Sequence, residues 1–182
     1  CEACGGYGSS LEIDPENPVC SYNLGNTYLK TARCTEAIQA YVGALRSEKD
    51  SEIAIGSRAN LAIAYEQCAQ KDGAIKAFLD RIKLDPGSPT HHYDLGKIYA
   101  EKGMPDHAIN EWENTVKLDP LYCPAHYELA MQANKLLDTK NTLARCRDFV
   151  HCTNEGGRGG SPARWADSIA QCKELVRRLE ML

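Results

Sequence analysis

One pattern of residues recurs along the chain at a spacing of about 34 positions. A leucine followed by a small residue occurs four times, at Leu24, Leu61, Leu95 and Leu129. The steps between successive leucines are 37, 34 and 34 residues, so four units cover most of the 182-residue chain. A repeat of this length predicts a stack of similar supersecondary units, in which each unit buries an apolar face against its neighbours.

The spacing inside each of the first three units predicts two helices. In the first unit, Gly25 is followed by Tyr28, and a second segment places Ala37 four residues before Tyr41. Residues four apart share one face of a helix, so Ala37 and Tyr41 are expected to pack together against the first helix. The small residue would allow the two helices to approach closely. The next two units carry the same set at Ala62, Tyr65, Ala74 and Phe78, and at Gly96, Tyr99, Ala108 and Trp112.

This arrangement resembles the tetratricopeptide repeat (TPR), and the resemblance covers residues 18–154. It is carried by the Leu-Gly/Ala…Tyr of the first helix, the Ala…aromatic of the second helix, and the closing Asp-Pro at 85–86 and 119–120. The resemblance implies an all-α solenoid of αα-hairpins that winds as a right-handed superhelix with a concave face. The four repeats are expected at about 18–51, 55–88, 89–122 and 123–154.

The fourth repeat departs from the pattern. Thr142, Cys146 and Asn154 stand where the alanine, the aromatic residue and the proline are expected, so its second helix is predicted to pack less regularly. A glycine-rich stretch at 155–161 predicts a flexible loop. Residues 162–182 then predict an amphipathic helix that caps the last repeat. Its apolar stripe consists of Trp165, Ile169, Cys172, Val176 and Leu179.

The N-terminal segment, residues 1–17, resembles the tail of a repeat. Leu11 to Pro15 copies the closing pattern of a unit, while Gly5, Gly6 and Gly8 would interrupt a helix before it. The solenoid is therefore expected to begin with half a unit. We expect its open end to be covered by this N-terminal segment or by a partner, because apolar helix surface is rarely left in water.

The nine cysteines can be paired by position. In two antiparallel helices joined by a turn, facing residues lie at equal distances in sequence from the turn. Three pairs centre on predicted turns, and a fourth would close a short loop around Pro15 and Pro18. The candidates are Cys34–Cys68, Cys123–Cys152, Cys146–Cys172 and Cys4–Cys20. The alternative is that these residues are small apolar core side chains. Disulfides would favour an extracytoplasmic setting, which is periplasmic, outer-membrane-anchored or extracellular.

Cys1 is left over from this pairing. A chain that starts with Cys and has no initiator Met resembles a mature bacterial lipoprotein, in which the first cysteine carries a lipid. The alternatives are an intermolecular disulfide and a fragment end. Since no run approaches the ~18 apolar residues of a membrane span, membrane contact is expected only through such a lipid.

Other chemistry has little support in the sequence. The net charge is −4, so a nucleic-acid partner is not expected. Cys1 and Cys4 form a single CxxC that resembles one zinc knuckle, whereas a structural zinc site needs four ligands. A zinc or redox role for this CxxC is the lowest-ranked alternative. The sequence contains no recognisable catalytic triad, carboxylate pair or phosphate loop, so we expect neither an enzyme nor a cofactor nor a metal site.

The remaining candidate site is the inner face of the first helices. Its predicted lining is Tyr22, Asn26, Lys30, Ile63, Tyr93, Lys97, Tyr127 and Met131. Tyrosine combines apolar area with a hydroxyl group, which suits contact with a peptide. We therefore predict a non-catalytic scaffold that binds a protein or peptide in a tyrosine-lined groove. The alternative is a structural subunit that binds further copies of itself, head to tail, and forms a filament or tube.

One known TPR function can be checked against this groove. TPR domains that bind chaperone tails clamp a C-terminal carboxylate with two Asn and three cationic residues. Asn26 and Asn60 match the two Asn, whereas Tyr22, Thr90 and Asp94 stand where the cations are required. The sequence therefore does not support a carboxylate clamp.

Overall fold

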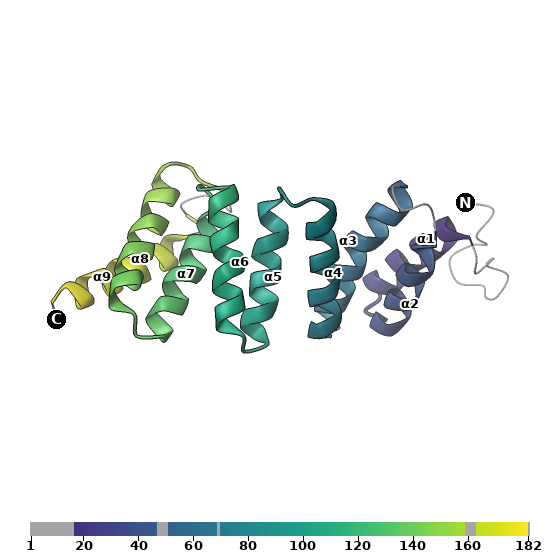
Figure 1. Cartoon of the computed structure of the whole chain (residues 1–182), viewed down its shortest axis with the longest axis horizontal. Helices are drawn as coiled ribbons and strands as arrows, with labels where there is room; N and C mark the ends of the chain where they lie inside the picture. The colour runs from purple at the N-terminus through teal and green to yellow at the C-terminus, as the bar shows by residue number, and fades with distance from the viewer. Residues whose placement is uncertain (1–16, 47–50, 69, 159–162, 182) are drawn as a thin grey trace. The chain divides into compact units, whose positions relative to one another are not determined.

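The computed structural model describes residues 17–46, 51–68, 70–158 and 163–181. These residues form nine helices (Figure 1), and apart from one isolated bridge between Tyr122 and Arg158 they contain no β-structure. None of these helices is both long enough and apolar enough to cross a bilayer. The chain divides into two units, Cys1–Leu84 and Asp85–Leu182, and each is described by itself.

The first unit consists of two helix pairs, and the second unit consists of two helix pairs followed by a single helix, in the predicted order. The first unit contains α1 (Pro18–Lys30), α2 (Cys34–Ala44), α3 (Glu52–Gln67) and α4 (Lys71–Leu84). The second unit contains α5 (Pro89–Glu101), α6 (Pro105–Leu118), α7 (Cys123–Lys135), α8 (Thr139–Asn154) and α9 (Ala166–Glu180). Within the units, consecutive helices pack against one another, and α1 also contacts α3.

The helix starts follow from local capping. The side chain of Asn17 accepts hydrogen bonds from the backbone N–H groups of Val19 and Cys20 at the start of α1. Ser51 caps α3 in the same way, with its Oγ 3.2 Å from the N–H of Ala54. Helix α3 therefore begins three residues before the predicted start of the second repeat. It has 16 residues where α1 has 13, and these extra residues account for the longer first step of the repeat.

The small residue of each first helix lies under the aromatic residue of the second helix. A Cβ atom added to Gly25 would lie 2.6 Å from the ring of Tyr41, and one added to Gly96 would lie 2.5 Å from Trp112 Nε1. Both aromatic side chains are almost completely buried. Glycine at these positions therefore permits a helix approach that any larger side chain would prevent.

The buried aromatic residue of the second helix in the fourth repeat is Phe149, three positions after Cys146. Both residues are fully buried in one cluster, and the Phe149 ring lies 5.2 Å from that of Tyr127 and 5.8 Å from that of Trp165. Thr142 is also buried, and its hydroxyl group donates a 2.7 Å hydrogen bond to the carbonyl of Asp138. Helix α8 continues to Asn154 because the chain has no proline there to stop it. The departures in sequence thus change which residues pack rather than whether the helix packs.

The turns inside the first, third and fourth hairpins each contain one residue in the left-handed region. This residue is Ala32 (φ 57°) in the first repeat, Gly103 (φ 77°) in the third and Leu137 (φ 58°) in the fourth. Glycine adopts this conformation without strain, whereas residues with a Cβ pay about 1–2 kcal/mol. The side chain of Leu137 is 88% exposed, so it recovers little of this cost by burial.

We expect Leu137→Gly to raise the free energy of unfolding by about 0.5 kcal/mol, because relief of strain exceeds the added entropy of the unfolded chain. Urea denaturation followed by far-UV circular dichroism would measure the change. Leu136→Gly is the matched control, since Leu136 is also exposed but has a φ of −83°. Glycine at this position should lower the free energy of unfolding. Equal effects of the two substitutions would contradict the assignment of strain to Leu137.

Candidate functional site

In the first unit, Asn26 holds three helices together. Its Oδ1 accepts a 2.9 Å hydrogen bond from the hydroxyl group of Tyr41 on α2 and a 2.8 Å bond from Nδ2 of Asn60 on α3. Burial raises the pKa of Tyr41 to about 12, in keeping with a hydroxyl that remains a donor. The predicted groove residue Asn26 is therefore committed to packing between repeats.

Tyr22 has a similar role. Its ring lies 6.2 Å from that of Tyr41, and a Cβ atom added to Gly56 of α3 would lie 3.0 Å from its hydroxyl oxygen. Tyr22 is thus half-buried between α2 and α3. Of the predicted groove residues in this unit, Lys30 and Ile63 are the ones that stay exposed.

An exposed aliphatic stripe runs along α3. Ile55 is 56% exposed and Ile63 is 39% exposed, and Ala59 lies midway between them in sequence. Residues spaced by four share one helix face, so these three form a continuous strip, which we call the α3 stripe. The sequence prediction included Ile63 but missed Ile55, although the four-residue spacing pointed to it.

In the second unit, Tyr93 and Lys97 line α5 and interact with each other. The Nζ of Lys97 lies 5.9 Å from the centroid of the Tyr93 ring and 3.9 Å from Oδ1 of Asp94. The ring of Tyr122 lies 5.1 Å from that of Tyr93. Burial raises the pKa of Tyr93. Burial also raises the pKa of the nearby Glu128 carboxyl, and the positive charges of Lys135 and Lys97 partly offset that rise. This part of the predicted groove is an aromatic and charged cluster.

The other two predicted groove residues, Tyr127 and Met131, lie under α9. The hydroxyl group of Tyr127 donates a 2.8 Å hydrogen bond to Oε1 of Gln171, and Nε2 of Gln171 lies 3.3 Å from the sulfur of Met131. The rings of Tyr127 and Trp165 are 6.4 Å apart. The predicted capping helix therefore contacts both of these predicted groove residues.

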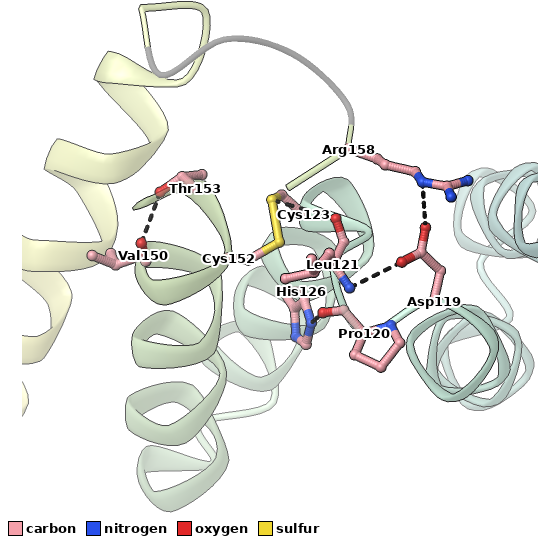
Figure 2. The surroundings of a disulfide bond; sticks show 9 residues. All are labelled: Asp119, Pro120, Leu121, Cys123, His126, Val150, Cys152, Thr153 and Arg158. Carbon is pink, nitrogen blue, oxygen red and sulfur yellow. Dashed lines mark hydrogen bonds and ion pairs between the residues drawn. A yellow bond between two sulfur atoms is a disulfide. The ribbon is translucent and has the colours of Figure 1, made fainter. Parts of the chain in front are cut away.

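The predicted pair Cys123 and Cys152 forms a disulfide that joins α7 to α8, with Cα atoms 5.5 Å apart (Figure 2). The chain after α8 then folds back over this bond. Arg158 donates a 2.7 Å hydrogen bond to the carbonyl of Leu121 and accepts one from the N–H of Cys123. A Cβ atom on Gly157 would overlap both sulfurs. The described part of the glycine-rich loop is therefore pinned to the disulfide, in contrast to the predicted flexible loop.

The remaining cysteines divide into three groups. Cys34 neighbours Cys68 and Cys146 neighbours Cys172, which agrees with the predicted pairings. Both pairs are thiols in the structure, which does not contain the predicted disulfides between them. Cys20 is disulfide-bonded, while its predicted partner Cys4 lies outside the described residues. Cys1, the CxxC and the half-repeat of residues 1–16 also lie outside them. Within the described ranges, no group of three or more His, Cys, Asp or Glu could hold a metal ion.

Solved structures with a similar fold are known, although comparison by sequence finds no match. No family model and no curated protein matches the sequence. Among solved structures, a crystal structure of MamA aligns with a TM-score of 0.69 at 21% identity, covering 80% of this chain and 84% of that one. YrrB, described as a TPR protein with an unusual peptide-binding site, aligns at 0.65 and 19%, covering 79% and 73%. A tetratricopeptide repeat protein from Parabacteroides merdae aligns at 0.68 and 12%, covering 87% and 64%.

The chain has a TPR fold. The helix pairs, the crossing glycines and these structural matches agree on this point. Since the identities are below 25%, the matches concern the fold. What the TPR hairpins of this chain bind has to be argued from its own side chains.

In this TPR chain, Cys68 of the first unit, which neighbours Cys34, has a raised thiol pKa. Burial, followed by the hydrogen bond with Cys34, raises the pKa of Cys68 from its ordinary value of 9.0 to about 12. We expect Cys68 in reduced protein to be alkylated by iodoacetamide about 1000-fold more slowly at pH 8 than an ordinary thiol, since only the thiolate reacts. Cys34→Ala should restore part of the rate, as measured by peptide mass spectrometry. A normal rate at Cys68 in wild-type protein would contradict this prediction.

Proposed function

We propose that the chain is a non-catalytic interaction scaffold whose first unit binds an apolar protein segment along the α3 stripe. The observation that carries the proposal is the exposure of Ile55 and Ile63 on one face of α3, at 56% and 39%. Burial of such aliphatic area contributes about 25 cal/mol per Å², which supplies a driving force for association. The fold that the chain shares with YrrB, itself described as having a peptide-binding site, supports this choice.

Four predicted groove residues are equivalent in the repeat. Asn26, Ile63, Lys97 and Met131 each stand two residues after the repeat leucine. Lys97 is a cation beside the Tyr93 ring and Asp94, and the other three explain why the α3 stripe is favoured. Asn26 is bonded to Tyr41 and Asn60, and Met131 is covered by α9. Of these three, only Ile63 has an exposed side chain. The second repeat therefore offers the accessible apolar contact.

Polar groups beside the stripe favour a peptide over a purely apolar ligand. The contact between Asn26 and Asn60 joins α1 to α3, and Lys30 and Ile63 each lie about one helical turn further along. Lys30 is exposed and can donate hydrogen bonds to carbonyl or carboxylate oxygens of a bound segment. The proposed ligand therefore carries apolar side chains together with backbone or acidic oxygens.

Two matched substitutions test this surface. Peptides selected by phage display on the immobilised full chain would serve as the probe, and their affinities would be measured by fluorescence anisotropy. We expect Ile63→Asp to weaken binding by about 10-fold or more, because a charge would be desolvated in the contact. Leu79→Asp is the control, since Leu79 on α4 is 38% exposed, almost the same as Ile63. The proposal fails if no peptide is selected, or if Leu79→Asp weakens binding as much as Ile63→Asp.

We also propose that the chain works in an oxidising, extracytoplasmic compartment. The Cys123–Cys152 disulfide and the bonded state of Cys20 support this setting, since cytosolic thiols are kept reduced. Intact mass and thiol alkylation of protein from its native source, under non-reducing conditions, would test it. Nine alkylatable thiols would exclude the compartment, and an added lipid mass on Cys1 would support a membrane anchor there.

A further inference from the structure

Helix α9 is attached to α8 mainly through apolar side chains. Cys172 is fully buried in the same cluster as Cys146 and Phe149, and Trp165 and Val176 pack against this cluster. The rings of Phe149 and Trp165 meet edge to face at 5.8 Å. An exposed ion pair between Arg147 of α8 and Glu180 of α9 adds to this packing. Such contacts leave a terminal helix able to lift transiently from the fold, since an exposed ion pair contributes little.

Two thiols face each other across this attachment. Cys146 of α8 and Cys172 of α9 are both fully buried and share a hydrogen bond. That bond lowers the pKa of the Cys146 thiol, against the effect of burial, and raises the pKa of Cys172. Cys146 is therefore the sulfur that ionises first, with the Cys172 S–H as its donor.

A cavity of about 350 Å³ lies against Cys146. Its walls also include Val176, the cationic side chains of Arg147 and Lys173, and the imidazole of His151. Cys146 is itself fully buried, so a small disulfide compound in this cavity reaches its sulfur when α9 lifts. The thiolate is the form of Cys146 that attacks the compound.

We propose that Cys146 and Cys172 form a reversible disulfide latch, closed by a small disulfide compound, that fixes α9 over Tyr127 and Met131. The Cys146 thiolate attacks one sulfur of the compound RS–SR, the S–S bond breaks, and RS⁻ leaves. Cys172, deprotonated by the departing RS⁻, then attacks the Cys146 sulfur, and the second RS⁻ leaves and takes up the proton first released by Cys146. The balance is two cysteine thiols and RS–SR giving one protein disulfide and two RSH, with two electrons passing to the compound.

The latch controls access to one part of the second unit. Tyr127 and Met131 are partly buried and make polar contacts to Gln171 of α9, so these polar groups and the covered parts of both side chains are released when α9 lifts. Closing the latch would tie α9 to α8 through a loop from Cys146 to Cys172. The α3 stripe lies in the other unit. The latch therefore stands or falls independently of the proposed ligand surface.

The test compares wild-type protein in two redox states. The full chain would be equilibrated in reduced and oxidised glutathione, with the Cys123–Cys152 disulfide verified by peptide mass spectrometry in both states. Amide hydrogen exchange over residues 166–180 is the readout. We expect exchange of α9 to be roughly 100-fold slower in the oxidised state, because cross-linking the helix suppresses its local opening.

Two double variants identify the pair responsible. Cys34→Ala/Cys68→Ala should keep the redox response of α9, whereas Cys146→Ala/Cys172→Ala should abolish it. The proposal is overturned if Cys146 and Cys172 remain alkylatable in oxidised glutathione, or if their disulfide forms and exchange of α9 does not change. Both of these outcomes are read from the wild-type chain, so they do not depend on a variant that folds.

Discussion

Trp112→Ala should lower the free energy of unfolding of the second unit by about 3–5 kcal/mol, the largest single effect expected in this chain. The Trp112 side chain is 2% exposed and lies on the backbone of Gly96, where α5 and α6 cross. Its Nε1–H also donates a 3.3 Å hydrogen bond to the carbonyl of Tyr93. Removal would leave a cavity and would lose this hydrogen bond. Urea denaturation followed by far-UV circular dichroism would measure the loss.

A double-mutant cycle with Gly96 tests the physical reason. Gly96→Ala alone should destabilise by about 1–3 kcal/mol, because its Cβ would lie 2.5 Å from a ring that cannot move. In the Trp112→Ala background the same substitution should stabilise by up to about 1 kcal/mol, since alanine favours the helix and no longer meets the ring. Additive effects would show that the close approach does not set the requirement for glycine.

Loss of the Cys123–Cys152 disulfide is expected to have the second largest effect. The bond closes a loop with a sequence separation of 29, and its removal in Cys123→Ala/Cys152→Ala should lower the free energy of unfolding by about 3 kcal/mol. The double variant avoids a lone buried thiol. A change below about 1 kcal/mol would contradict a structural role for this bond.

Gly157 offers an independent test of the same region. Its Cβ position lies 2.6 Å from the sulfur of Cys152 and 2.8 Å from the carbonyl oxygen of the same residue. Gly157→Ala should therefore destabilise by about 1–3 kcal/mol. Gly87→Ala is the control, because the nearest atom to its Cβ position is 3.8 Å away and its effect should lie within about 0.5 kcal/mol. Equal effects would mean that the chain does not need glycine beside the disulfide.

Much of the fold follows from local spacing in the sequence. The crossing residues Gly25 and Gly96 and their aromatic partners lie 16 residues apart within one hairpin, so the helical period and a short turn determine their contact. The same reasoning pairs Cys123 with Cys152, because two antiparallel helices joined by a turn bring equidistant residues together. Helix α8 shows the limit of this reasoning, because its buried aromatic residue is Phe149 and not the residue at the position that the repeat predicts.

The sequence could name candidate groove residues, but it could not tell their surroundings apart. Repetition places Asn26, Ile63 and Met131 at equivalent positions and gives them one predicted role. The structure assigns three different situations: Asn26 bonds between repeats, Met131 lies under α9, and Ile63 is exposed. These differences arise from neighbours 34 to 40 residues away, which a pattern within one repeat does not contain.

By itself, the sequence determined the repeat, the helix pairs and the close crossings, because all of these depend on residues near one another in the chain. Only the tertiary structure decided which surface stays open. After α8 the chain brings Gly157 onto the disulfide and α9 onto Tyr127, and neither contact follows from the spacing within one repeat. Helical periodicity specifies faces within a hairpin, whereas the docking of a terminal helix depends on the shape of the whole packed surface.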